Sequence, residues 1–222
     1  MGFSTLGKNV PLKTALIIIF VLLLFVIGTG LLLSNMLLPD PVVVPRQEDI
    51  RLTSAQKIAK QNPDNVEALI QLGYTHLTVK NYEQAVAAYQ TAYELAPESP
   101  MVQYHLALAY LALEDYAEAI VFLKPLADKG LFNVDAHYAL GNAYYVTGDY
   151  NEAVESFKKV IVLMPGAADA HYLLALSYES LGDSEQAIKS LNRALTMVPN
   201  YQEAQVALNR LSLLANDADT EE

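Results

Sequence analysis

Apolar positions recur every 34 residues through most of the chain after residue 65. Within one period they follow helical spacing in two segments, which a short polar turn separates. Two sets of positions carry the period, namely Leu72, Leu106, Leu140 and Leu174, and Ala85, Ala119, Ala153 and Ala187. A fixed period over four copies predicts stacked helix-turn-helix repeats at residues 66–99, 100–133, 134–167 and 168–201.

Both ends of such an array need a cover, because a terminal repeat has no neighbour to bury its apolar face. Residues 48–65 are predicted to provide an N-terminal capping helix, with Ile50 and Ile58 on one face. Residues 202–215 are predicted to form a C-terminal capping helix. The remaining residues, 216–222, are rich in carboxylates and are expected to form a disordered acidic tail.

A second pattern lies near the N-terminus, where residues 14–39 contain no charged side chain and are mostly Leu, Ile, Val and Phe. Residues 14–38 would form a helix of about 37 Å, which is long enough to cross a hydrocarbon core of about 30 Å. A cleaved signal peptide is the competing interpretation, but its apolar region is usually shorter and ends at a small-residue cleavage site. The sequence therefore favours an uncleaved transmembrane helix at residues 14–38.

The flanks of this segment suggest its orientation. Residues 1–13 form a short head with Lys8 and Lys13, and residues 39–47 form a Pro-rich spacer in which Arg46 is the only basic residue. Because Lys and Arg favour the cytoplasmic side, we expect a cytoplasmic N-terminus and repeats outside the cytoplasm. The opposite orientation would place the repeats in the cytosol.

The repeats resemble the tetratricopeptide repeat (TPR), in which small residues let two helices approach closely and aromatic residues fill the space between repeats. Repeats one, three and four carry the pattern in Leu72-Gly73, Ala85, Tyr89 and Pro97, in Leu140-Gly141, Tyr144, Ala153, Phe157 and Pro165, and in Leu174-Ala175, Tyr178, Ala187 and Pro199. The second repeat departs from it, because Pro125 lies inside its second helix and Leu131 replaces the closing proline. Pro125 is expected to kink or shorten that helix, and Gly130 to end it.

This resemblance implies an all-α, right-handed superhelix of four TPR repeats with a C-terminal capping helix, preceded by one transmembrane helix. It also implies that the first helix of each repeat lines a concave groove. Tyr104, Tyr138 and Tyr172 recur with the 34-residue period and would offer broad apolar faces with a polar tip. The candidate partner-binding residues are Tyr74, Tyr104, Leu108, Tyr138, Asn142, Tyr145, Tyr172 and Leu176.

Composition argues against several other functions. Two lysines and no acid precede Asp40, so the rest of the chain carries 12 basic and 25 acidic residues. Such a domain repels nucleic acid, and no basic stripe is visible in the sequence. The chain lacks Cys, and its four histidines have no metal-site spacing; His137 and His171 stand where the TPR pattern has an aromatic residue. We therefore expect no catalytic residue, metal, cofactor or small-molecule substrate.

The sequence thus predicts a single-pass membrane protein that binds proteins or peptide segments as a scaffold or adaptor. Similarity to bacterial TPR proteins with an N-terminal anchor implies a place in a bacterial inner membrane and a role in assembling membrane or cell-envelope complexes. Cytochrome maturation and outer-membrane or secretion chaperoning are examples of such a role. Two alternatives remain open at this stage. One is a permanent accessory subunit of a larger membrane complex, and the other is a docking protein facing the cytosol, similar to an import receptor.

Overall fold

The computed structural model describes residues 20, 21, 23–27 and 46–220, and its side chains from residue 46 extend to residue 213. The chain divides into two units at residue 45, and the helices described below belong to the second unit, residues 46–222. The larger unit consists of the helices α2 (Gln47–Gln61), α3 (Val66–Thr78), α4 (Tyr82–Leu95), α5 (Pro100–Ala112), α6 (Tyr116–Asp128), α7 (Asn133–Thr147), α8 (Tyr150–Leu163), α9 (Ala168–Ser180), α10 (Ser184–Met197) and α11 (Gln202–Thr220). No strand occurs within these residues.

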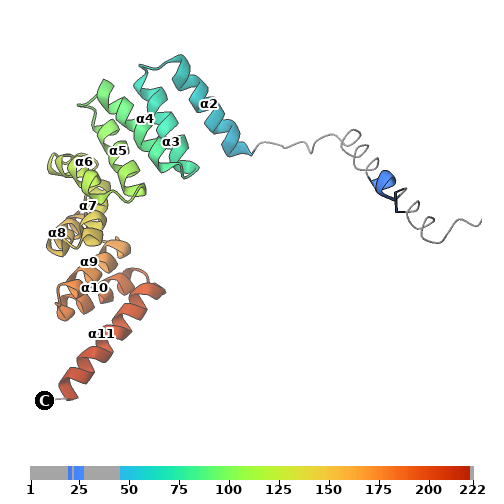
Figure 1. The fold of residues 1–222 in the computed structure, drawn as a ribbon. Coiled ribbons are helices and arrows are strands. Elements are labelled where there is room, and N and C mark those ends of the chain that lie inside the picture. Colours follow the sequence, from blue (N-terminus) through green and yellow to red (C-terminus); the bar gives the residue numbers. More distant parts are fainter. Residues whose placement is uncertain (1–19, 22, 28–45, 221–222) are drawn as a thin grey trace, which may run out of the picture. The chain divides into compact units, whose positions relative to one another are not determined.

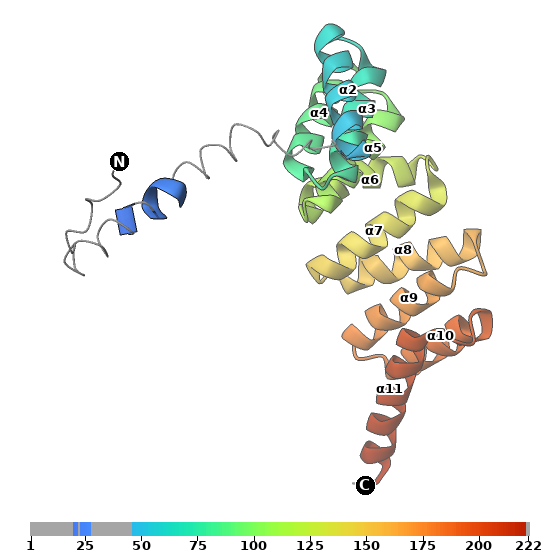
Figure 2. The same ribbon diagram turned by 90° about the vertical axis from the view of Figure 1, so that its right-hand side faces the viewer.

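The helices form a TPR superhelix in which each helix packs on the next along the chain (Figures 1 and 2). The helices α3 to α10 pair into four hairpins, and α2 and α11 pack on the two outer hairpins. In Figure 1 the stack follows a curve, with α7 on its inner side and α8 on its outer side. This confirms the predicted TPR superhelix.

The predicted head, most of the predicted transmembrane segment at residues 14–38 and nearly all of the predicted spacer lie outside the described residues. The described part of that segment, residues 20, 21 and 23–27, is helical, and its side chains are exposed. Within the described residues, no helix combines the length and apolar character that crossing a membrane requires.

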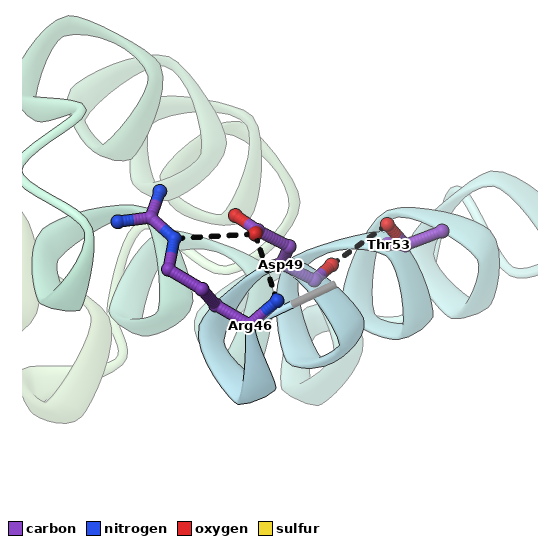
Figure 3. A network of polar contacts seen from close by, with 3 residues as sticks. All are labelled: Arg46, Asp49 and Thr53. Atoms are coloured by element: carbon purple, nitrogen blue, oxygen red, sulfur yellow. Dashed lines mark hydrogen bonds and ion pairs between the residues drawn. The ribbon is translucent and has the colours of Figure 1, made fainter. Parts of the chain in front are cut away.

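The capping helix α2 begins at Gln47, one residue before the expected start, and a polar network fixes this end (Figure 3). The Arg46 backbone N–H donates to Asp49 Oδ2 at 3.2 Å, and Arg46 Nε donates to the same oxygen at 3.4 Å. One turn later the Thr53 hydroxyl donates to the Asp49 carbonyl at 2.8 Å. Asp49 thus satisfies an otherwise free N–H and places a negative charge at the positive end of the helix dipole.

Within each hairpin, the two helices meet where the first helix has no side chain or only a methyl group. A Cβ atom added at Gly141 would lie 2.6 Å from Phe157 Cε1, and one added at Gly73 would lie 2.7 Å from Tyr89 Cζ. In hairpins two and four the same positions hold Ala107 with Leu123 and Ala175 with Leu191, all at most 1% exposed. The small and the large residue therefore vary together: glycine accompanies an aromatic ring, and alanine accompanies leucine.

The turn inside each hairpin requires a left-handed backbone. The residue at this position has a positive φ in every hairpin, with values of 61° at Lys80, 63° at Glu114, 87° at Gly148 and 80° at Gly182. Glycine adopts this conformation without the steric cost that a Cβ imposes, so the first two turns carry a strain that the last two lack.

Helix α6 continues through Pro125 without a break. The helix ends at Asp128, whereas α4, α8 and α10 extend to the equivalent of residue 129. Gly130 has a φ of 69°, its N–H donates to the Ala127 carbonyl at 3.0 Å, and the Leu131 N–H donates to the Leu126 carbonyl at 2.8 Å. The helix is thus slightly shortened and then terminated by Gly130, as predicted.

At the other end, α11 continues to Thr220, past the expected end of the capping helix at residue 215. The expectation of a disordered tail from residue 216 was therefore wrong as far as residue 220. The physical reason is that residues 202–220 contain no Gly or Pro to stop a helix once it has begun.

Replacing Gly141 by Ala should destabilise the protein by about 1–3 kcal/mol, because the new methyl group overlaps the Phe157 ring. Adding Phe157→Leu should recover part of this loss by recreating the Ala–Leu pair of the second and fourth hairpins. Urea unfolding of both single variants and the double variant measures the coupling. Additive effects of the two substitutions would contradict the proposed close approach.

Replacing Glu114 by Gly should raise stability by about 1 kcal/mol, because it removes the Cβ from a left-handed position. Gly148→Ala should lower it by a similar amount. Gly166→Ala is the matched control, since Gly166 lies outside the left-handed region and has open space around it. Thermal unfolding distinguishes these cases, and equal effects at Gly148 and Gly166 would exclude backbone strain as the cause.

Candidate functional site

The predicted groove residues all lie on the first helices of the hairpins. Tyr74 is on α3, Tyr104 and Leu108 are on α5, Tyr138, Asn142 and Tyr145 are on α7, and Tyr172 and Leu176 are on α9. Tyr74 is 56% exposed, and the other seven are half-buried. Full burial of Tyr104, Tyr138 and Tyr172 between helices would have excluded them from a binding surface, and the structure does not bury them in this way. Their role in binding remains a prediction.

These three periodic residues, called the groove tyrosines below, each pack against another aromatic ring. Tyr104 is stacked on Phe132 with ring centroids 4.4 Å apart and ring planes 7° apart. Tyr138 meets the edge of Phe157 at 6.1 Å, and Tyr172 lies 5.2 Å from Tyr201. One side of each ring is thereby held in place, which lowers the entropy that a bound partner would have to remove.

Each groove tyrosine also lies near a carboxylate from the first turn of the following first helix or of α11. Burial raises the pKa of all three phenols, and the nearby carboxylate raises it further. The pairs are Tyr104 with Asp135, Tyr138 with Asp169, and Tyr172 with Glu203. A phenol with its usual pKa of about 10 is already protonated at neutral pH, and a raised pKa extends this to more alkaline conditions, so each hydroxyl can donate a hydrogen bond to a partner.

The polar tips of this surface have polar neighbours within the protein. The Asn142 side chain lies near the Tyr138 hydroxyl, and the Asp169 carboxylate lies near the Tyr201 hydroxyl, where burial and then this carboxylate raise the pKa of Tyr201. Asp169 thus brings the first turn of α9 close to the residue just before α11. Asn142 is therefore placed beside a groove tyrosine, as a polar contact for a peptide would require.

A cleft of about 750 Å³ lies at the C-terminal end of the groove, between α7, α9 and α11. It contains three of the predicted residues, Tyr145, Tyr172 and Leu176. An ion pair of 2.6 Å between Arg210 and Glu179 joins α11 to α9 at this cleft. Both side chains are partly exposed, so we expect the ion pair to add little to the free energy of unfolding. Its main effect is to fix the position of α11 relative to α9.

The capping helix α11 contributes residues to this cleft that were not among the predicted groove residues, namely Gln202, Glu203, Val206, Ala207 and Arg210. A signal was available in the repeat register. Glu203, Val206 and Arg210 lie 34 residues after Asp169, Tyr172 and Leu176, so α11 occupies the place of a fifth first helix. The sequence-based prediction treated α11 only as a capping helix and therefore did not include its residues in the groove.

Tyr74 lies apart from that cleft. It lines a second cleft of about 520 Å³ between α2 and α3, together with Ile58, Glu67 and Gln71. Tyr104, Leu108, Tyr138 and Asn142 line neither cleft and lie on the helices between them. The predicted residues therefore do not gather in one pocket, and they are distributed along the row of first helices.

A strained residue adjoins the groove at the junction of the second and third hairpins. Phe132 has φ 50° and ψ 39°, a left-handed conformation that is rare for an aromatic residue. Its ring stacks on Tyr104, and its carbonyl accepts from the Ala136 N–H at 2.7 Å. Packing and hydrogen bonding hold the residue in a conformation that costs about 1–3 kcal/mol, and strain of this kind is often found at binding sites.

The two histidines that replace an aromatic residue of the TPR pattern, His137 and His171, are buried between helices. His171 Nε2 lies 3.2 Å from the Pro165 carbonyl, so the ring ties α9 to the loop before it. Burial lowers the pKa of His137. Across the described residues, no group of three or more His, Asp or Glu side chains could hold a metal ion.

An all-helical stack of hairpins with a row of half-buried tyrosines along its first helices defines a TPR scaffold for protein–protein interaction. The model of the cytochrome c-type biogenesis protein H TPR domain matches residues 50–172, which is more than half of the chain. The chain therefore belongs to this family. A general tetratricopeptide repeat model also matches residues 147–211.

Solved structures of other TPR proteins have the same fold. The crystal structure of MamA is 26% identical, with a TM-score of 0.62, and the match covers 70% of this chain and 96% of that one. A MamA from Desulfovibrio magneticus RS-1 is 20% identical, with a TM-score of 0.66 over 71% of this chain and 89% of that one. YrrB, described as a TPR protein with an unusual peptide-binding site, is 22% identical, with a TM-score of 0.65 over 70% and 80%. No curated protein matches the chain.

Proposed function

We propose that this protein is a membrane-anchored adaptor that binds peptide segments of partner proteins along the first helices of its TPR hairpins. In this way it assists the assembly of membrane or cell-envelope complexes, and its family points to c-type cytochrome biogenesis as the setting. The observation that carries the proposal is the row of groove tyrosines, half-buried and one repeat apart, which leads into the cleft at α11.

The chemistry of this row suits an extended or helical peptide. The tyrosine rings provide apolar contact, and their protonated hydroxyls together with Asn142 can hydrogen-bond a peptide backbone. Leu108 and Leu176 lie one turn after Tyr104 and Tyr172, so each provides an apolar neighbour for a partner's side chain. YrrB, which shares the fold, has a peptide-binding site, and this precedent supports a peptide as the partner.

The proposal places the protein in a bacterial inner membrane, held by residues 14–38, with the N-terminus in the cytoplasm and the TPR unit on the other side. Its support is the uncharged run at residues 14–39 and the two lysines before it. The spacer at residues 39–47 would then separate the TPR unit from the membrane surface.

Replacing all three groove tyrosines by alanine should reduce crosslinking to specific partners in native membranes by more than about tenfold, because it removes the apolar faces along the groove. The matched control is Val121→Ala with Leu95→Ala, which truncates apolar side chains that are 61% and 43% exposed on second helices. Circular dichroism checks that each variant retains its helices. Partners that persist in the tyrosine variant but disappear in the control would contradict binding in the groove.

Protease accessibility tests the orientation separately. Added protease should digest the TPR unit in spheroplasts and leave it intact in sealed inverted vesicles. The reverse result would place the unit in the cytoplasm, and recovery of the whole protein in the soluble fraction would contradict the anchor at residues 14–38.

A further inference from the structure

The outer face of the stack contains a cleft whose charge is opposite to that of the domain as a whole. Three cations surround it, with Lys158 on α8 and Lys189 and Arg193 on α10. The cleft has a volume of about 400 Å³, and no acidic residue lines it. The sequence showed no basic stripe because these cations are dispersed along the chain and are gathered only when α8 packs beside α9 and α10.

The cleft also has an apolar wall. Ile161 and Val162 from α8 and Leu174 and Tyr178 from α9 line it. Val162 is 78% exposed, the highest exposure among the large apolar side chains that the structure describes. An apolar surface rimmed by charge is typical of a docking site for another protein.

Little within the protein neutralises these cations. Lys158 is bound by Glu155 at 3.0 Å, and its Nζ lies 5.8 Å from the centre of the Tyr178 ring. Lys189 and Arg193 make no ion pair within the described part of the chain, and Glu185 is the acidic residue that lines the surface beside them on α10. The cleft therefore retains unpaired positive charge in a domain that is strongly acidic.

The repeat itself provides a comparison. The cleft between α6 and α8 is lined by ten residues, each 34 positions before its counterpart in the cleft between α8 and α10. It has three acids, Asp128, Glu152 and Glu155. Their counterparts are Val162, Gln186 and Lys189. The cleft between α6 and α8 is thus lined by both acidic and basic side chains. In the cleft between α8 and α10, a residue that is not acidic stands in place of each of these acids.

We propose that the cleft between α8 and α10 is a second docking surface, which binds an acidic peptide segment of a partner protein. An apolar side chain of that segment would pack against Val162 and Ile161, and flanking carboxylates would pair with Lys189 and Arg193. The lining of this surface comes from α8, α9 and α10 and contains none of the groove tyrosines, so the two surfaces are separate.

A peptide fits the cleft better than a membrane surface does. A bilayer is broad and contacts a wide area, and the many acidic residues of the domain would be repelled by anionic headgroups. Three cations around a cleft of about 400 Å³ instead match one or two side chains and their flanking charges. Electrostatic complementarity of this local kind favours specific docking.

The test uses the full-length protein in detergent and a fluorescent synthetic peptide in which a leucine pair is flanked by runs of Asp and Glu. Fluorescence anisotropy should show binding that weakens as salt is added. A matched peptide with Lys in place of the acids should not bind. Failure of the acidic peptide to bind, or equal binding of both peptides, would overturn the proposal.

The decisive variant copies the neighbouring repeat and combines Val162→Asp, Gln186→Glu and Lys189→Glu. Because the protein already accommodates this set between α6 and α8, the variant should fold, and circular dichroism checks that it does. Its affinity for the acidic peptide should be at least about tenfold lower. The matched control is Lys124→Gln at the mixed cleft, which should leave the affinity unchanged. Undiminished binding by the folded triple variant would disprove the proposal.

Two further experiments test whether the acidic peptide binds in the groove instead and whether the cleft binds lipid. The variant lacking the three groove tyrosines should bind the acidic peptide as the wild type does, and loss of binding would assign the peptide to the groove. Flotation with vesicles of phosphatidylcholine and phosphatidylglycerol should show no dependence on Lys189 or Arg193. A requirement for these cations in vesicle binding, without peptide binding, would assign the cleft to lipid and overturn the proposal.

Discussion

Each hairpin depends on the close approach of its two helices at one position, where the first helix carries Gly or Ala and the second carries a fully buried large side chain. Since protein interiors are close-packed, the volume removed on one helix must be supplied by the other. Gly73 with Tyr89 and Ala107 with Leu123 are two solutions of the same constraint. Because every first helix is fixed in this way, successive first helices keep one register, and a residue type repeated every 34 positions becomes a row on one surface.

The groove tyrosines follow from this register, but their neighbours differ between repeats. Tyr104 stacks on Phe132, just before α7, and Tyr172 lies tilted by 47° beside Tyr201, just before α11. Tyr138 instead meets the edge of the core residue Phe157. The second hairpin, which lacks the closing proline, instead places the strained residue Phe132 against Tyr104. A regular scaffold therefore presents a row of tyrosines whose surroundings are not uniform along its length.

The distribution of charge gives the two faces different chemistry. Carboxylates at the first turns of α7, α9 and α11 stabilise the helix dipoles and also lie beside the groove tyrosines. On the outer face, the cations of α8 and α10 meet at an apolar wall that contains no acid. A scaffold with unlike faces can hold two segments of different charge at once.

The repeat, its length, and the Gly and Pro positions at which helices turn or end could all be predicted from the chain alone, because these depend on periodicity and on local backbone preference. Gly130 and the turn at Gly148 are examples. The assignment of the groove tyrosines to one surface also followed from the period. Two features emerged from the packing of the helices instead: α11 completes a cleft with α7 and α9, and Lys158, Lys189 and Arg193 meet across two helices. The cleft at α11 joins residues from Tyr145 to Arg210, and the sequence indicates it only when the repeat register is followed past the last recognised repeat. The three cations lie inside recognised repeats, and only the packing of α8, α9 and α10 brings them together.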